Sequence, residues 1–382
     1  MFDLNTEAED RRVRHVVLLV AHDCNLRCKY CYEEFKDSRK MSFDTARGIV
    51  VNEMRRLAGS SEFSQVEFAC LGGEPLLNFG LIRELVEWTE GVYHGDDHFF
   101  SVRTNGTLLT EEMKGWLKEH KKLVRVGLSL DGLSEMNARN RSSSNVDVSF
   151  FTENWPSERV RLTLFPDSIS LLAKTVRELN GRGIPFVVVP AEGIEWTSDA
   201  VKRYKGELAK LVLDYQTNYK EGVDTGLFPY DPYEYFQNRN DSPVPYCGSY
   251  GNIVCFDADG IDYPCHIFSP ITIGKERAMA FRAESATLQK IKIDPVCAGC
   301  EIRTVCKPCF GFHYKIAGDV GVWTERNTIC RLRKMLAMAS AEFYLLAMGG
   351  AGCRQEVGTR EEYVRTAMAL RMVKGKGGEH LL

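Results

Sequence analysis

The 382-residue sequence lacks the features that mark membrane, secreted and nucleic-acid-binding proteins. It has no run of about eighteen apolar residues, so no transmembrane helix is predicted. Its formal net charge of −3 is too small to favour nucleic acid or a membrane surface as a partner. Its first residues, Met1–Glu7, are acidic and do not resemble a signal peptide. We therefore expect a cytoplasmic protein.

Cysteine, by contrast, is abundant. A chain with 13 cysteines and no export signal is expected to bind metal rather than to form disulfides. Cys24, Cys28 and Cys31 have C-x3-C-x2-C spacing and follow an apolar, β-rich run at His15–Val20. Thiolates are the usual ligands of a four-iron cluster, and three of them would leave one iron open to a substrate or cofactor. A zinc loop is the alternative, although zinc sites usually combine two distant CxxC pairs.

Strand-like and helix-like segments alternate through the N-terminal half. The predicted strands are His15–Val20, Gln65–Leu71, Phe99–Arg103, Val124–Leu130, Val160–Phe165 and Phe186–Val189. The predicted helices are Ser42–Leu57, Gly80–Thr89, Glu111–Glu119, Ser168–Asn180 and Ser198–Tyr219, with Ser42 as an N-cap. Six successive β-α units indicate a parallel sheet with right-handed crossovers.

The cysteine spacing, with the aromatic Tyr30 before the last cysteine, resembles that of the radical S-adenosylmethionine (SAM) enzymes. The resemblance implies that the open iron binds the amino and carboxylate groups of SAM, and that reductive cleavage yields a 5′-deoxyadenosyl radical. It also implies an α/β fold, an open, TIM-like (β/α)6 partial barrel. A flavodoxin-like or Rossmann sheet is the alternative, but no GxGxxG follows the first strand.

Polar motifs follow the predicted strands at their carboxyl ends, where α/β folds place active sites. By the same resemblance, Gly72-Gly73-Glu74-Pro75 binds the SAM amino group, and Ser129 and Asp131 face its ribose or methionine part. Arg141 is a candidate for the SAM carboxylate, and Arg139 competes with it because Met136-Asn137 replaces a His-Asp pair common in relatives. The expected SAM-binding residues are Tyr30, Gly72, Gly73, Glu74, Thr104, Asn105, Ser129, Asp131 and Arg141. Glu192 and Glu195, after the sixth strand, are either substrate contacts or plain loop charges.

Eight further cysteines follow a Pro- and Tyr-rich connection at 221–245. Their number fits two four-iron clusters or two four-cysteine zinc sites. Their pattern resembles the SPASM domain of radical SAM enzymes, although two residues, not the usual three, separate Cys306 from Cys309. The resemblance implies two auxiliary [4Fe-4S] clusters, hence three clusters in all. The first would be held by Cys247, Cys255, Cys265 and Cys309, and the second by Cys297, Cys300, Cys306 and Cys330.

The remaining segments complete the expected organisation. Short strands at Ile253–Phe256 and Ile261–Tyr263 form a hairpin around the turn signal Asp257–Gly260. Cys70 is expected in the core and Cys353 as an incidental thiol. We expect a barrel at 1–220, a linker at 221–245, a small cysteine-rich SPASM domain at 246–334, and a helical tail at 335–382. The C-terminal helices are predicted at Leu332–Ala347 and Arg360–Met372.

The SPASM resemblance implies oxidation of a ribosomally made peptide or protein. Sulfatase-maturing relatives place an aspartate base directly after the cysteine that corresponds to Cys265, whereas this chain has His266. A histidine is a candidate base, but the substitution favours a peptide cross-linking maturase that forms thioethers at cysteine. Carbon–carbon cross-linking, epimerisation, formylglycine formation, a small-molecule radical enzyme and a non-catalytic zinc module are the alternatives.

The expected partners follow from this chemistry. They are a precursor peptide and an electron donor such as flavodoxin or ferredoxin. Too few residues precede the first strand for a module that grips a leader peptide, so we expect either a separate leader-binding protein or direct binding of the leader by the barrel and tail.

Overall fold

The computed structural model describes residues 12–133, 135–143, 146–218, 226, 251–284, 300, 302, 306, 309–318 and 328–349. The predictions for Cys247, Cys297, Cys353, the helix at Arg360–Met372 and all of the linker except Gly226 lie outside these residues. None of the helices within the described ranges has the length and apolar character needed to cross a membrane.

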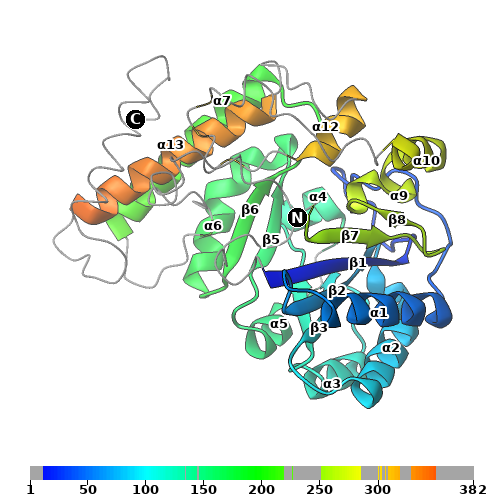
Figure 1. The fold of residues 1–382 in the computed structure, drawn as a ribbon. Helices are drawn as coiled ribbons and strands as arrows, with labels where there is room; N and C mark the ends of the chain where they lie inside the picture. Colours follow the sequence, from blue (N-terminus) through cyan, green and yellow to red (C-terminus); the bar gives the residue numbers. More distant parts are fainter. Residues whose placement is uncertain are drawn as a thin grey trace.

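The six predicted strands are all present and pair in parallel within two sheets (Figure 1). The first four pair in chain order: β1 (Val13–Ala21), β2 (Gln65–Gly72), β3 (His98–Thr104) and β4 (Val124–Leu128). The other two pair with each other: β5 (Val160–Leu164) and β6 (Phe186–Pro190). A single bridge between Ser129 and Arg161 connects β4 to β5. The strand order therefore follows the chain, and the predicted partial barrel is confirmed.

Helices cover the outside of the strands (Figure 1). The helices that correspond to predicted ones are α1 (Phe43–Ala58), α2 (Phe79–Val92), α3 (Glu111–Glu119), α6 (Leu172–Gly181), α7 (Ser198–Asn218) and α13 (Thr328–Gly349). The predicted N-cap is confirmed, since Ser42 Oγ accepts a 3.2 Å hydrogen bond from the amide of Thr45. The helix predicted at Ser168–Asn180 instead begins as a 3-10 turn, η3 (Pro166–Leu171), ahead of α6.

Several short helices were not predicted. They are α4 (Glu135–Arg141), α5 (Val148–Asn154), α9 (Pro270–Ile273), α10 (Lys275–Glu284), α12 (Phe310–Ala317), and the 3-10 turns η2 (Pro75–Asn78) and η5 (His266–Phe268). Most of these helices span at most two or three turns, too few for a hydrophobic period to stand out in the sequence.

Strand β1 is buried on both faces, as a central parallel strand must be. Val16 and Leu18 pack in the main core together with residues of α1 and α2. Val17 and Leu19, on the opposite face, pack against Cys255 and Ile271 from the cysteine-rich part of the chain. Both halves of the sequence therefore contribute to the packing around β1.

The predicted hairpin is present and extends the barrel sheet. Strands β7 (Ile253–Phe256) and β8 (Asp262–Tyr263) are antiparallel, and the Gly260 amide donates to the Asp257 carbonyl across the turn at 2.8 Å. Strand β7 also pairs in parallel with β1, which gives the order β4-β3-β2-β1-β7-β8. The cysteine-rich part thus begins beside the first barrel strand (Figure 1).

Candidate active site

The three clustered cysteines lie on the loop that follows β1. All three are partly exposed, and the loop is held against the end of β3 by side-chain amides. Asn105 Nδ2 donates to Asn25 Oδ1 at 2.9 Å, and Asn25 Nδ2 donates to Thr107 Oγ1 at 2.8 Å. The cysteine loop and the carboxyl end of the third strand therefore form one structural unit.

The surroundings of these thiols suit an iron–sulfur cluster. Burial raises the pKa of Cys24 to about 11, and burial raises the pKa of Cys28 while Arg141 opposes that rise. Lys36 Nζ donates to Cys31 Sγ at 2.9 Å. The cations Arg141 and Lys36 favour the thiolate form of Cys24 and Cys28, which is the form that binds iron, whereas burial opposes it. The three residues fit the expected cluster, although sequence spacing gave no indication of Lys36.

The glycine pair after β2 packs directly on the cysteine loop. A Cβ at Gly72, which has φ +134°, would lie 2.0 Å from the Ala21 carbonyl oxygen, and one at Gly73 would lie 2.3 Å from that of Asp23. The Gly73 amide donates to Ala21, and the Glu74 amide to Asp23, both at 2.9 Å. The two glycines therefore let the ends of β1 and β2 approach each other.

Glu74 is buried, and its carboxylate already accepts three hydrogen bonds. Thr104 Oγ1 donates at 2.6 Å, the Asn105 amide at 2.9 Å and the Leu76 amide at 3.1 Å. Burial raises the pKa of this carboxyl, and the three donors oppose that rise. Glu74 thus joins the carboxyl ends of β2 and β3 into one rim, with Thr104 and Asn105 as its partners.

A second buried carboxylate, Asp131, organises the polar side of the site. The Tyr30 hydroxyl donates to Asp131 Oδ2 at 2.6 Å, and the Thr163 amide donates to Asp131 Oδ1 at 2.9 Å. Asn140 Nδ2 also donates to Asp131, at 3.2 Å. Asp131 therefore links the cysteine loop, through Tyr30, to β5. Ser129, two residues earlier, is partly buried at the bridge between β4 and β5.

The two candidate arginines differ in position. Arg141 is 7% exposed, its Nε lies 3.2 Å from Asp131 Oδ1, and its guanidinium carbon lies 5.4 Å from the centre of the Tyr30 ring. Burial opposes its charge, yet Asp131 and Tyr30 outweigh burial and raise its pKa. Arg139 instead pairs with Glu135 on the exposed side of α4. The structure therefore brings Arg141, and not Arg139, to the cysteine loop.

Three of the cysteines assigned to the first auxiliary cluster lie near one another. Cys255 on β7 and Cys265 after β8 are buried, and burial together with Cys265 raises the pKa of Cys255. Cys265 belongs to a small apolar cluster against which Cys309 packs. Their placement from a hairpin, a turn and the start of α12 fits one shared group.

His266 follows Cys265 and is buried in η5. Its ring centre lies 5.7 Å from that of Tyr32, and its Nδ1 has no hydrogen-bond partner among the described residues. Burial, with Arg161 adding to it, lowers the pKa of His266 well below its usual value. The imidazole is therefore neutral at pH 7 and can accept a proton or a hydrogen bond.

Three of the four cysteines assigned to the second auxiliary cluster also gather. Cys300 and Cys306 pack against Ile302 and Ala337. Cys306 and Cys300 both add to the pKa rise that burial produces at Cys330 on α13. Within the described part of the chain, no three His, Cys, Asp or Glu side chains are arranged to hold a single metal ion. A four-iron cluster needs a wider arrangement, because each cysteine binds a different iron.

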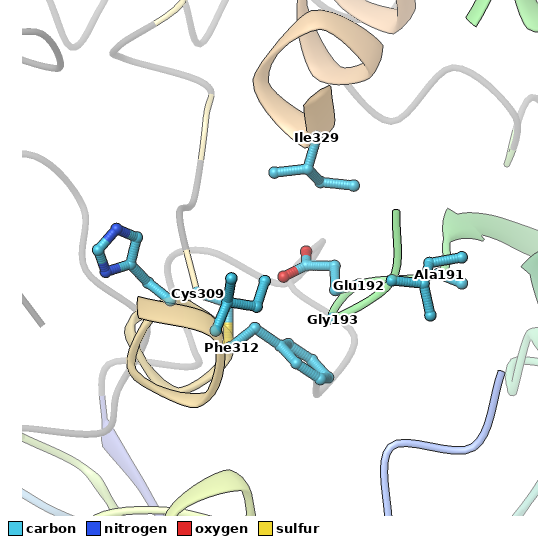
Figure 2. A pocket seen from close by; sticks show the side chains of 9 residues that line it. Ala191, Glu192, Gly193, Cys309, Phe312 and Ile329 are labelled. Carbon is cyan, nitrogen blue, oxygen red and sulfur yellow. The ribbon is translucent and has the colours of Figure 1, made fainter. Parts of the chain in front are cut away.

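A small pocket with a cavity volume of about 20 Å³ lies between the loop after β6 and helices α12 and α13 (Figure 2). Glu192 and Gly193 line it from the barrel side, and Cys309, Phe312 and Ile329 from the other. Glu195 is exposed.

Cys70 lies in the core on β2, as predicted, and burial raises its pKa to about 12.

Comparisons with known proteins match the N-terminal part of the chain most clearly. Residues 18–150 match the radical SAM superfamily. A cysteine-type anaerobic sulfatase-maturating enzyme of Clostridium novyi is 32% identical over 132 residues, which are 34% of this chain and 35% of that protein. The subtilosin biosynthesis protein AlbA of Bacillus subtilis is 26% identical over 272 residues, 66% of this chain and 55% of that protein. The chain thus spans well under half of the first curated relatives that it matches.

A solved structure extends the likeness in fold to nearly the whole chain. Native anSMEcpe with bound AdoMet and a peptide named Cp18Cys superposes with a TM-score of 0.63 and 18% identity. The alignment covers 95% of this chain and 99% of that one. At this identity the match establishes the fold alone.

Proposed function

We propose that this protein, whose residues 18–150 are a radical SAM domain, abstracts a hydrogen from a ribosomally made peptide and oxidatively cross-links it. The bond that we favour is a thioether at a cysteine of the peptide. When bound, a [4Fe-4S] cluster with one iron free of protein ligands supplies the electron that splits SAM into methionine and a 5′-deoxyadenosyl radical. The side chains around Cys24, Cys28 and Cys31 would bind and position SAM beside that cluster.

One observation carries this proposal: the three-cysteine loop, the Glu74 rim and the Asp131 network meet at adjacent strand ends. Asn25 and Tyr30, both on the loop, reach Asn105 and Asp131. An anion such as the SAM carboxylate suits the buried guanidinium of Arg141, whose Nε lies 3.2 Å from Asp131 Oδ1. We propose that Gly72, Gly73, Glu74 and Ser129 complete the SAM site as backbone and rim contacts.

We further propose three [4Fe-4S] clusters in the chain. Cys247, Cys255, Cys265 and Cys309 would hold the first auxiliary cluster, and Cys297, Cys300, Cys306 and Cys330 the second. The grouping of the described members of each set supports the assignment. These clusters would accept the substrate electron, while flavodoxin or ferredoxin would supply the electron for SAM cleavage. A precursor peptide, with a separate leader-binding protein, would complete the set of partners.

Formylglycine formation is the second candidate function, favoured by the similarity to a sulfatase-maturating enzyme. That reaction needs a base near the substrate, and neutral, buried His266 is the residue that we propose for it. His266→Ala would abolish formylglycine formation but leave thioether formation intact, where a cysteine thiol of the peptide ionises without a side-chain base. Mass spectrometry of the product distinguishes the two reactions.

The test is anaerobic reaction of reconstituted protein with SAM, dithionite and a cysteine-containing peptide encoded by a neighbouring gene. Loss of two hydrogens per modified site supports cross-linking, whereas unchanged mass with deuterium uptake from heavy water indicates epimerisation. The Cys24→Ala/Cys28→Ala/Cys31→Ala variant should release no 5′-deoxyadenosine, and Cys70→Ala, which changes a core thiol, should release it normally. About twelve irons per chain are expected from three four-iron clusters; two zincs and little iron would exclude this function.

A further inference from the structure

A buried ion pair joins the barrel to the long C-terminal helix. Glu192, on the loop after β6, accepts a hydrogen bond from Arg333 on α13, and the two side chains are 8% and 9% exposed. Figure 2 shows the Glu192 side chain between α12 and the first turn of α13. Such a pair contributes little net stability, since desolvation cancels much of the attraction between the two charges.

Arg333 also lies against the cysteines of the second auxiliary set. Its Nη1 is 3.7 Å from Cys306 Sγ. On α13, Cys330 precedes Arg333 by three residues and so shares its helix face. Cys300 packs against the same two residues as Cys306, Ile302 and Ala337, and adds to the pKa rise of Cys330. Of the described members of this set, Cys306 contacts this buried guanidinium and Cys330 lies within its electrostatic reach.

We infer that the Arg333–Glu192 pair sets the reduction potential of the cluster held by Cys297, Cys300, Cys306 and Cys330. The inference rests on the proposed cluster assignment. Reduction adds a negative charge to a cluster, so a buried cation at its ligands favours the reduced form. Glu192 lies behind that cation and offsets part of its effect. The loop after β6 thereby influences how readily this cluster accepts an electron.

Removing either charge should shift the midpoint potential of this cluster, in opposite directions for the two residues. A pair with a purely structural role would not produce opposite shifts. Arg333→Gln should lower the midpoint potential of this cluster, and Glu192→Gln should raise it. Each shift should change the ratio of reduced to oxidised cluster at one applied potential by about tenfold. Arg333→Lys should stay near wild type, and the double variant should lie between Arg333→Gln and wild type.

The experiment is an anaerobic potentiometric titration of the full-length reconstituted protein, followed by electron paramagnetic resonance. Changing Cys24, Cys28 and Cys31 to alanine in all samples removes the signal of the SAM cluster. Arg177→Gln is the matched control, because Arg177 forms a surface pair with Asp214, and its midpoints should equal the wild type. If Arg333→Gln loses iron, Glu192→Gln alone decides the outcome.

The outcomes separate this inference from the proposed function. Opposite shifts with full iron content support it. Unchanged midpoints with full iron content, or shifts of the same sign, overturn it and leave the proposed function standing. About four irons in this background, where two auxiliary clusters require about eight, would instead overturn the cluster assignment itself.

Discussion

Asp131 illustrates how a single carboxylate can position several parts of a site. The motif after the fourth strand predicted that Asp131 belongs to the site, but its partners Tyr30 and Asn140 are 101 and 9 residues away in sequence. No local pattern encodes such contacts, because they depend on how the strand ends meet. The same holds for Lys36, which reaches Cys31 only because of the path of the loop.

Replacing Asp131 by asparagine should therefore be costly. The change keeps the shape but leaves the buried Arg141 charge without its carboxylate, and it weakens the bond from Tyr30. We expect a loss of about 3 kcal/mol in the free energy of unfolding, as for a buried pair that loses one member. Urea unfolding of the apoprotein measures it.

Asp167→Asn is the control for this prediction. Asp167 is 62% exposed in side chain and lies 3.9 Å from Lys29, and a surface pair of this kind contributes less than about 1 kcal/mol. Equal losses in the two variants would show that Asp131 does not organise the site.

At the scale of elements, the regular alternation of strands and helices was predictable, and the short helices were not. Elements such as β2 and α3 have a clear hydrophobic period and clear boundaries in the sequence. Helix α3 was predicted at its observed bounds. Helices α4 and α5 fill the connection between β4 and β5, where seven residues each give too little periodicity. The N-cap of α5, Asp147, is recognisable only once the helix is known.

Helix α5 provides a test through its N-cap. Asp147 Oδ1 accepts a 3.3 Å hydrogen bond from the Phe150 amide, and Asp147 Oδ2 pairs with Lys114 at 2.9 Å. Asp147→Ala should cost about 1 kcal/mol of folding free energy at pH 7. Asp147→Asn should cost less, because the amide oxygen still caps the helix.

The pH dependence of this effect has a definite sign. The hydroxyl of Ser149 and the amine of Lys114 lower the pKa of Asp147 to about 2, from 3.8. The folded state thus binds the proton more weakly than the unfolded state, so the stabilisation is present above about pH 4 and is lost as the pH falls towards 2. The stability difference between wild type and Asp147→Asn should shrink over that range in urea unfolding; a constant difference would contradict the assignment.

At the scale of the whole molecule, the sequence predicted the hairpin but not where it docks. Strand β7 pairs with β1, which puts the start of the cysteine-rich part beside the strand that carries the SAM-cluster loop. Pairing between strands more than two hundred residues apart leaves no periodic trace, since each strand only shows that it is apolar. The buried turn residue Asp257 strengthens this contact, with Oδ1 2.6 Å from His22 Nε2 and Oδ2 3.1 Å from Arg39 Nη1.

Asp257 should therefore couple the hairpin to the cysteine loop. Both Asp257 and His22 are fully buried, so Asp257→Asn leaves His22 poorly paired and should cost about 2 kcal/mol. Hydrogen exchange measured by mass spectrometry should rise in β7 and β8 and also in the end of β1, which precedes Cys24. Asp259→Asn is the matched control in the same turn, because Asp259 is 46% exposed and 3.8 Å from Arg39. Faster exchange confined to the hairpin would mean that the two halves do not communicate through Asp257.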